Sequence, residues 1–343
     1  MTVSSELEKQ VYSDFNLHDD AFQIDPYPIY EQLRLKPICK VMPEDMWVVS
    51  RYVDVKQVLS NPAAFSSKAL DILYDSDWLS GECRNPRLIA SQDPPQHGQY
   101  RGVVNRAFIN SAIEYLIPLM KSTAEKLAVK FESSDSINFM EEFAYPYIGT
   151  VITHIVGVGD KQELADFREW VALEEGVSLS KPSAEYIKAF ERATLRQSKY
   201  FLQAAQERRV KPQADLVTHL VNAQVNGEKL KDKELCSILS LLVAAGFVTT
   251  IQMLNHGIMI FSQRPDLVAD LKQSPELIPQ FVEELLRFRP TTISTVRLAT
   301  RPVEINGVTI PKGDLVLALL SSAGRDPESF DDPNTFNLHR RGG

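Results

Sequence analysis

The chain has 343 residues, of which 44% are hydrophobic and 24% are charged, and its formal net charge is −8 at pH 7. This composition is typical of a globular protein with a sizeable core, and the acidic balance argues against a nucleic-acid-binding protein. The first residues lack the basic and then apolar order of a signal peptide, and the longest nearly apolar run, Ile238–Val248, is too short to span a bilayer. The three cysteines, Cys39, Cys83 and Cys236, form no Cys-x-x-Cys pair. We therefore expect a cytoplasmic protein with no membrane and no nucleic-acid partner.

In chain order, the first predicted element is a short strand at Trp47–Val49. It is followed by a stretch, Ser66–Gln92, in which helical and strand periodicity both fail. We interpret that stretch as a long loop, either functional or a surface excursion, because long loops inside compact domains are often functional. Apolar residues then recur at helical spacing in three segments, which predicts helices at Ala112–Phe131, Ala184–Arg209 and Asp232–Ser262.

Towards the C-terminus, Asn306-Gly307 supplies the positive φ angles of a tight hairpin turn between two predicted strands, Val303–Ile305 and Val308–Ile310. The segment Leu315–Leu320 is consistent with another strand or with a buried apolar segment of either type. The chain has no internal repeat and no long linker. These elements predict one compact, mainly α domain with a small β region.

A helix start is predicted at Asp93-Pro94-Pro95, where Asp93 can accept hydrogen bonds from the first free amides and Pro94 suits the first turn. His97 and Arg101 follow four residues apart, on one helix face. Two cations near the positive end of a helix repel each other unless an anion lies between them. The alternative is a neutral His97 and an Arg101 that pairs with a surface carboxylate, and the spacing alone favours that alternative.

The run Ile238–Val248 is apolar on all sides, which predicts a helix that is buried all round. Gly246 inside this helix costs about 1 kcal/mol relative to alanine. Close approach of another group to the backbone would explain the glycine, and so would tight packing of two helices.

Glu284 and Arg287 lie three residues apart at the edge of a predicted helical stripe. The stripe consists of Ile278, Phe281, Val282, Leu285 and Phe288. We expect the pair to be partly buried, although a pair at this spacing is usually a solvated contact that contributes a few tenths of a kcal/mol.

Several segments together resemble the cytochromes P-450, the haem-thiolate monooxygenases, in their bacterial soluble form. Residues Glu284–Arg287 resemble the family's Glu-x-x-Arg helix, and Asp93–Arg101 resembles its Asp-Pro-Pro-x-His-x-x-x-Arg element. Ala245–Thr250 is similar to the Ala-Gly-x-acid-Thr-Thr box, and Phe336–Arg340 is similar to the Phe-Asp-x-x-Arg segment. The resemblance extends from Asp25 to about Arg340.

The resemblance implies the mainly α fold with a small β region of that family, and it implies roles for individual residues. One haem propionate would be held by His97 and Arg101, and the other by Arg297. The haem face would be lined by Ala245 and Gly246, and the catalytic residue that helps to deliver protons would be Thr249. The substrate pocket would be lined by Ser294, Thr295 and Val296, and a structural network would consist of Glu284, Arg287 and Arg340.

The chain also departs from the family pattern. Val248 occupies the acidic position of the box and cannot relay a proton, and Asn337 stands where an aspartate is typical. None of the three cysteines lies in the Phe-Gly-x-Gly-x-x-x-Cys-x-Gly context that supplies the iron thiolate, so we expect no metal ligand in this chain. We expect an N-terminal segment at residues 1–24 and a single domain at residues 25–343. That domain would be C-terminally incomplete, a fragment truncated before the cysteine loop that binds haem b only weakly.

The expected function is that of a monooxygenase in bacterial secondary metabolism. It would act on a small organic substrate with molecular oxygen and receive electrons from a ferredoxin or flavodoxin. The alternative is a haem-free homologue that activates another biosynthetic enzyme. Val248 fits this alternative, whereas three retained propionate contacts fit it poorly.

Overall fold

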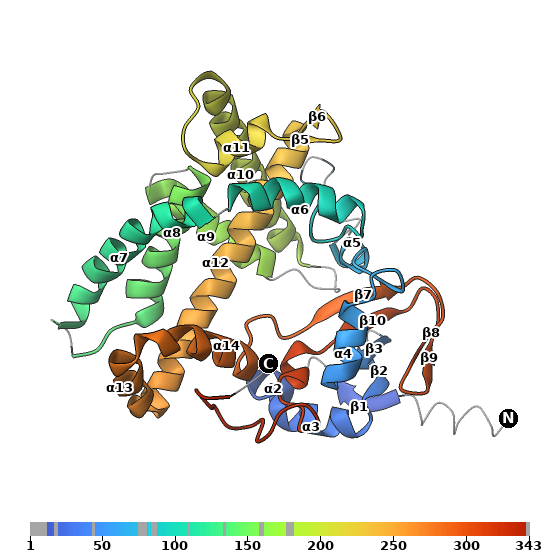
Figure 1. Ribbon diagram of the computed structural model, residues 1–343. Helices are drawn as coiled ribbons and strands as arrows, with labels where there is room; N and C mark the ends of the chain where they lie inside the picture. Colours follow the sequence, from blue (N-terminus) through green and yellow to red (C-terminus); the bar gives the residue numbers. More distant parts are fainter. Residues whose placement is uncertain are drawn as a thin grey trace. The chain divides into compact units, whose positions relative to one another are not determined.

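The structure is a computed structural model that describes residues 12–16, 20–42, 45–74, 81, 83, 88–108, 110–132, 135–157, 161–175 and 182–340. Most of these residues lie in helices and the strands are short, so the predicted mainly α fold with a small β region is confirmed (Figure 1). Backbone contacts divide the chain into two compact units. Unit 1 consists of Met1–Leu70 and His256–Gly343, and unit 2 consists of Asp71–Asn255.

Unit 1 is built on a six-stranded mixed sheet in the order β1-β2-β3-β10-β7-β4. In that order the strands are Tyr12–Asn16, Ile38–Met42, Met46–Val49, Leu315–Ala318, Thr295–Ala299 and Phe65–Ser66. The pairs β1–β2 and β3–β10 are parallel, and the other neighbours are antiparallel. All four residues of β3 are buried, which places the predicted strand Trp47–Val49 inside the sheet. The apolar segment Leu315–Leu320 divides into β10 and the start of a short helix.

The helices of unit 1 are α2 (Asp20–Ile24), α3 (Tyr27–Leu35), α4 (Tyr52–Leu59), α13 (Pro265–Gln273), α14 (Ile278–Phe288) and α15 (Leu320–Ala323), with a 3₁₀ turn at Pro275–Leu277. The predicted hairpin forms between β8 (Val303–Ile305) and β9 (Val308–Ile310). Its turn residues Asn306 and Gly307 have φ angles of 49° and 76°. These positive values are those that a tight hairpin turn requires.

Among the residues of unit 2 that the structure describes, the regular structure is helical apart from a two-stranded ribbon. Its helices are α5 (Ala69–Tyr74, which begins at the end of unit 1), α6 (Gln96–Ala107), α7 (Asn110–Glu132), a π-helical turn (Met140–Ala144), α8 (Tyr145–Val156), α9 (Lys161–Glu175), α10 (Ala184–Val210), α11 (Leu216–Asn222) and α12 (Asp232–Gln263, whose last turns belong to unit 1). The ribbon pairs β5 (Gln224–Val225) with β6 (Glu228–Lys229). The three long predicted helices correspond to α7, α10 and α12, and each predicted end lies within about two residues of the observed one.

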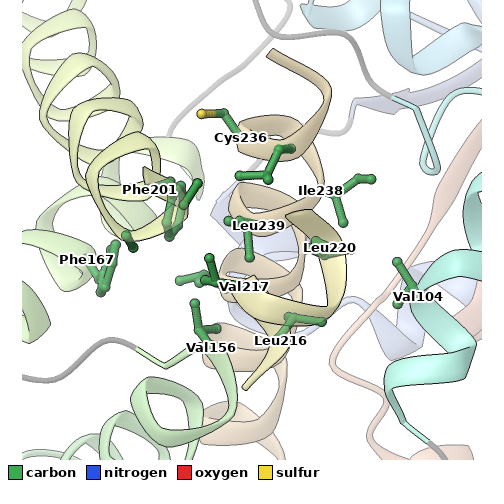
Figure 2. Close-up of a cluster of buried hydrophobic side chains, with 14 of the residues drawn as sticks. Val104, Val156, Phe167, Phe201, Leu216, Val217, Leu220, Cys236, Ile238 and Leu239 are labelled. Carbon is green, nitrogen blue, oxygen red and sulfur yellow. The ribbon is translucent and has the colours of Figure 1, made fainter. Parts of the chain in front are cut away.

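The core of unit 2 is an apolar cluster contributed by several helices (Figure 2). Phe167 on α9 stacks on Phe201 on α10, with ring centroids 5.6 Å apart. Leu239 on α12 and Val217 on α11 are fully buried in the same cluster. Burial of large apolar side chains from four helices accounts for the stability of this unit, because each fully buried side chain contributes about 1.5–3 kcal/mol.

The helix predicted to start at Asp93-Pro94-Pro95 is α6, whose first regular residue is Gln96 and whose N-cap, Pro95, has helical angles (φ −86°, ψ −15°) and makes no side-chain cap. The carbonyl oxygen of Asp93 accepts a hydrogen bond from the His97 amide at 3.0 Å, as in the first turn of a helix. The observed start therefore lies within about two residues of the predicted one.

One local prediction was wrong. The stretch Ser66–Gln92 is not a single loop, because it contains α5. Residues 75–80, 82 and 84–87 of that stretch lie outside the described part of the chain.

Candidate functional site

The middle of α12 has one buried face and one open face. Val243 and Phe247 are buried in the apolar core of unit 2, whereas Ala245 is exposed and Val248 and Thr249 are half-buried. The prediction of a helix buried all round is therefore wrong, because no described side chain covers Ala245. The hydroxyl of Thr249 donates a hydrogen bond to the carbonyl oxygen of Ala245 at 2.6 Å.

Gly246 has a packing explanation within unit 2. A β-carbon built at this position would lie 2.7 Å from Cδ1 of Ile152 on α8. The glycine thus allows α8 to pack closely against α12, which is one of the two explanations that the sequence left open. The clash involves the tip of a flexible side chain, so a small rotation of Ile152 would relieve it.

His97 and Arg101 lie on α6 of unit 2. Arg101 is exposed, and its Nε donates to Oδ1 of Asn105 at 3.1 Å. Within the described part of the chain, neither residue forms an ion pair, so the carboxylate partner of the alternative interpretation is not found there. His97 is half-buried. Two basic side chains on one helix face without an anionic partner fit an acidic group on a ligand.

Arg297 lies on β7 of unit 1, opposite Val316 of β10. Its guanidinium donates to the Thr295 hydroxyl at 2.9 Å and to the Val296 carbonyl oxygen at 2.8 Å. Ser294 and Thr295 are half-buried, and Val296 is buried. Strand β7 holds Thr295, Val296 and Arg297 in a fixed register, with Ser294 directly before its first residue, which suits a rigid wall of a site.

Glu284, Arg287 and Arg340 form one buried cluster in unit 1. The Nε of Arg287 lies 2.7 Å from Glu284 Oε2, and the Nε of Arg340 lies 3.1 Å from the same oxygen. The backbone amide of Asn337 donates to the other carboxylate oxygen at 2.8 Å. The Glu284 side chain is 3% exposed. Burial raises the pKa of this carboxyl, but the hydrogen bonds from Arg287, the Asn337 amide and Arg340 outweigh that effect and hold the pKa below its ordinary value.

The same guanidinium groups bond the backbone of the segment that follows α15. Arg287 donates to the carbonyl oxygens of Gly324 and Pro333 at 2.7 and 2.9 Å. Gly324 is needed at its position, because a β-carbon there would lie 2.5 Å from the carbonyl oxygen of Arg287. The Asn337 side chain, at the position where an aspartate was expected, accepts a bond from the His339 amide at 3.0 Å.

Arg325 is a buried charge that the sequence analysis missed. It is 6% exposed, and its guanidinium lies 3.5 Å from the ring centroid of Phe288 and 4.3 Å from that of Tyr27. Burial lowers its pKa to about 10. The segment around Arg325 has no periodic pattern, so an arginine within an otherwise small and apolar stretch was the one available signal.

Unit 1 also contains a cavity of about 870 Å³ beside the Glu284 cluster. Its walls come from α4, α14 and α15, with Leu59, Leu286 and Phe330 among the apolar residues and Arg287 and Arg340 among the charged ones. The cluster therefore faces an open, mostly apolar space within its own unit.

All three cysteines are buried. The thiol of Cys236 donates to the carbonyl oxygen of Ser198 at 3.8 Å. Burial, and secondarily the charge of Asp232, raises the pKa of this thiol to about 12. A thiol with that pKa stays protonated at neutral pH and is a poor metal ligand. In the described residues, no group of three His, Cys, Asp or Glu side chains could hold a metal ion.

The residues present thus fit part of a haem group. The basic side chains on α6 suit a carboxylate, and the small residues of the open face of α12 suit a flat apolar surface. The buried thiol of Cys236 does not suit the iron.

The helix α12 is long and apolar enough to cross a membrane by length and composition, and 44% of its most apolar window is buried inside the protein. The run Ile238–Val248, which was judged too short to span a bilayer, is only part of this helix, since α12 has 32 residues. Most of its buried apolar residues, such as Leu239 and Phe247, belong to the core cluster of unit 2. A core helix of a globular protein passes the same test, so the feature is weak evidence for a membrane span.

Comparisons with known proteins identify relatives along almost the whole chain. Residues 36–340 match the family described as Cytochrome P450. Cytochrome P450 107B1 of Saccharopolyspora erythraea is 30% identical, over 95% of this chain and 82% of its own length. The polyketide biosynthesis cytochrome P450 PksS of Bacillus subtilis is also 30% identical, with the same coverage. Among solved structures, cytochrome P450 CYP109Q5 from Chondromyces apiculatus superposes with a TM-score of 0.85 at 28% identity, covering 95% of this chain and 81% of its own.

Proposed function

Because the chain belongs to the cytochrome P450 family, we propose that it is a haem-dependent monooxygenase that oxidises a small organic substrate in bacterial secondary metabolism. The match over residues 36–340 carries this proposal. A relative named for polyketide biosynthesis supports the metabolic context. The haem-free activator is not favoured, since the relatives are cytochromes P450.

The cofactor of the family is haem, which supplies, when bound, the iron at which molecular oxygen is activated. We propose that His97 and Arg101 hold one propionate and that Arg297 holds the other. The absence of an ion pair for Arg101 among the described residues supports its part in this proposal. Ala245 and Gly246 would lie along the haem face, since neither carries a side chain larger than a methyl group.

Thr249 is the proposed catalytic residue. Its hydroxyl donates to the Ala245 carbonyl oxygen. The lone pairs of Oγ1 are therefore left to accept a hydrogen bond from water or from a substrate hydroxyl. Val248 beside it has no group that titrates. Protons would therefore reach Thr249 from water or from a hydroxyl of the substrate.

Ser294, Thr295 and Val296 are the proposed wall of the substrate pocket. We further propose that a ferredoxin or flavodoxin supplies electrons and that the protein acts in the cytoplasm. Residues 25–343 would fold as a single domain, preceded by an N-terminal segment at residues 1–24.

The polypeptide of residues 1–343 should bind haem b weakly. The proposed propionate contacts orient a porphyrin but do not coordinate its iron. The Cys236 thiol is buried and protonated, so it does not supply the missing iron ligand. Weak uptake with a histidine or water ligand is the expected state. The absorption spectrum of the reduced, carbon-monoxide-treated protein tests it, because thiolate ligation gives the red-shifted band. If this polypeptide gave that band, the proposal about the cysteines would be wrong.

Titration with haem b tests the propionate contacts in the full chain. Arg101→Ala should weaken haem binding about 2- to 10-fold, since an exposed charge-assisted contact contributes roughly 0.5–1.5 kcal/mol. The matched control is Arg106→Ala on the same helix, another exposed arginine without an ion pair among the described residues. If the two variants bound haem b with equal affinity, Arg101 would not be a propionate contact, and the family assignment would still stand.

A further inference from the structure

Unit 2 contains three buried polar groups that form no hydrogen bond within the described part of the chain. They are Nε1 of Trp170 on α9 and Oγ1 of Thr194 and Nε2 of Gln197 on α10. The three residues are 4%, 5% and 4% exposed. Buried polar groups in folded proteins nearly always have a partner, and leaving one unpaired is destabilising. Three such groups in one unit therefore call for a common explanation.

The pairing of α9 with α10 brings these groups to one level. Phe167 stacks on Phe201 at 5.6 Å, and Arg196 pairs with Glu169 at 2.5 Å, so the two helices run antiparallel in a known register. One turn beyond Phe167 on α9 is Trp170. One and two turns before Phe201 on α10 are Gln197 and Thr194, which share a face because they are three residues apart. This register places Trp170 beside the part of α10 that carries Gln197 and Thr194, and all three side chains are buried there.

The chemistry of the groups defines what can join them. The Trp170 indole can only donate. The Ser240 hydroxyl on α12 donates to Oε1 of Gln197 at 2.6 Å, which leaves the Gln197 amide nitrogen as a second donor. Two donors cannot satisfy each other, so an acceptor is required. The Thr194 hydroxyl can either donate or accept.

We propose that one water molecule is bound in the junction of α9, α10 and α12 as an integral part of unit 2. Its oxygen accepts hydrogen bonds from Trp170 and Gln197, and one of its protons is donated to Thr194. Buried waters typically make about three such bonds. This site is separate from the residues proposed to contact haem and does not depend on the function proposed above.

Nuclear magnetic resonance of the ¹⁵N-labelled full chain tests the proposal directly. The chain has three tryptophans, and loss of one indole signal in Trp170→Phe assigns that of Trp170. We expect a nuclear Overhauser effect between this indole proton and water. Its sign should be opposite in the laboratory-frame and rotating-frame experiments, as for a bound water, whereas chemical exchange of the proton with solvent would give the same sign in both. The Trp47 indole, which donates to Asp314 at 2.8 Å, is the reference for a buried donor with a protein acceptor. No water effect at Trp170 would overturn the proposal.

A nearly isosteric substitution provides a second test through the sign of a shift. Thr194→Val removes a partner of the water and breaks no other hydrogen bond within the described residues, so the denaturation midpoint should fall. If the hydroxyl were simply unpaired, removing it would raise the midpoint, and the proposal would be wrong. Thr250→Val, at an exposed position of helix α12, should leave the midpoint nearly unchanged.

Discussion

Unit 1 and unit 2 bury different kinds of polar side chain. The buried charged residues described in unit 1 are Arg34, Asp54, Glu284, Arg325 and Asp326. In the described part of unit 2, buried charge is confined to the pair Arg208–Asp215, whose atoms lie 2.6 Å apart. The other buried polar residues of unit 2 are neutral, and its apolar cluster is the larger of the two.

The difference follows from how each backbone satisfies its own hydrogen bonds. In unit 2 the helices pair their carbonyls internally. In unit 1 the segment after α15 has no regular structure, so its carbonyls need other donors. Arg287 and Arg340 supply them, Arg340 through bonds to Asp332 and Thr335 at 3.1 and 3.0 Å. The side chains of these two arginines, which are 8% and 11% exposed, take the place of secondary structure there, and Glu284 balances their charge.

The largest effect is expected where that balance is removed. Glu284→Ala leaves two guanidinium groups buried without a counter-ion, which should lower the free energy of unfolding by about 3–5 kcal/mol. Arg287→Ala should cost a similar amount. Denaturant unfolding of the purified variants measures both.

The neighbouring Glu283 is exposed on the same helix and provides the matched control. Glu283→Ala should change the unfolding free energy by less than about 0.5 kcal/mol. If the two glutamate variants were equally stable, Glu284 would be a solvated side chain and the contrast between the units would disappear.

A substitution in the apolar core of unit 2 should have the next largest effect. Leu239 is fully buried, and Leu239→Ala should cost about 2–5 kcal/mol through lost burial and the cavity left behind. If residues 25–343 unfold as one domain, the fluorescence of Trp47 in unit 1, measured in a chain whose Trp78 and Trp170 are replaced by phenylalanine, will report the same lowered midpoint as the helical circular dichroism signal. Separate midpoints would contradict the single-domain proposal, and exposed Leu195→Ala on α10 serves as the control.

Acid should weaken unit 1 through Glu284. Its pKa in the folded chain lies below its ordinary value of 4.5. Its stabilising contribution is therefore complete above that value and is lost as the pH falls through the lower folded pKa. Between about pH 5 and 3 the unfolding free energy of the wild type should fall more steeply than that of Glu284→Gln. Parallel curves in denaturant titrations at each pH would contradict this assignment.

The smallest effect should be the same in both units, because it is local to the backbone. Gly307 in unit 1 and Gly227 in unit 2 have φ angles of 76° and 83°, and a β-carbon at either would meet no atom within 4 Å. Alanine at either position should cost about 1–2 kcal/mol through its left-handed conformation alone. Gly102→Ala, inside helix α6 and equally open, should instead be stabilising by up to about 1 kcal/mol. Thermal melting of the three variants compares them.

The sequence predicted the long helices and the β8–β9 hairpin well, since periodicity and Asn306-Gly307 are local signals. It also placed Glu284 beside Arg287 on one helix. It did not predict the bonds from arginine to the carbonyls of Gly324 and Pro333, because those partners lie tens of residues away and have no pattern of their own. The open face of α12 was missed for a related reason, as an apolar sequence does not reveal which of its faces a neighbour covers.

The same limit applies to the polar groups of unit 2. A threonine and a glutamine on a helix such as α10 suggest an exposed face, but the register with α9 buries Thr194 and Gln197. That register depends on contacts such as Phe167 with Phe201. Contacts between helices are not visible in either helix alone, so the junction could be recognised only in three dimensions.

The burial of every cysteine makes the chain suitable for measuring its own openings by chemical labelling. Cys39 lies in the sheet of unit 1, and Cys83 and Cys236 lie in unit 2. A maleimide reagent needs an accessible thiolate, so the folded protein should resist modification at all three. The rate at which each cysteine is modified, followed by mass spectrometry, would measure how often the structure around that cysteine opens. An engineered surface cysteine could then carry a spectroscopic probe without removal of the natural ones.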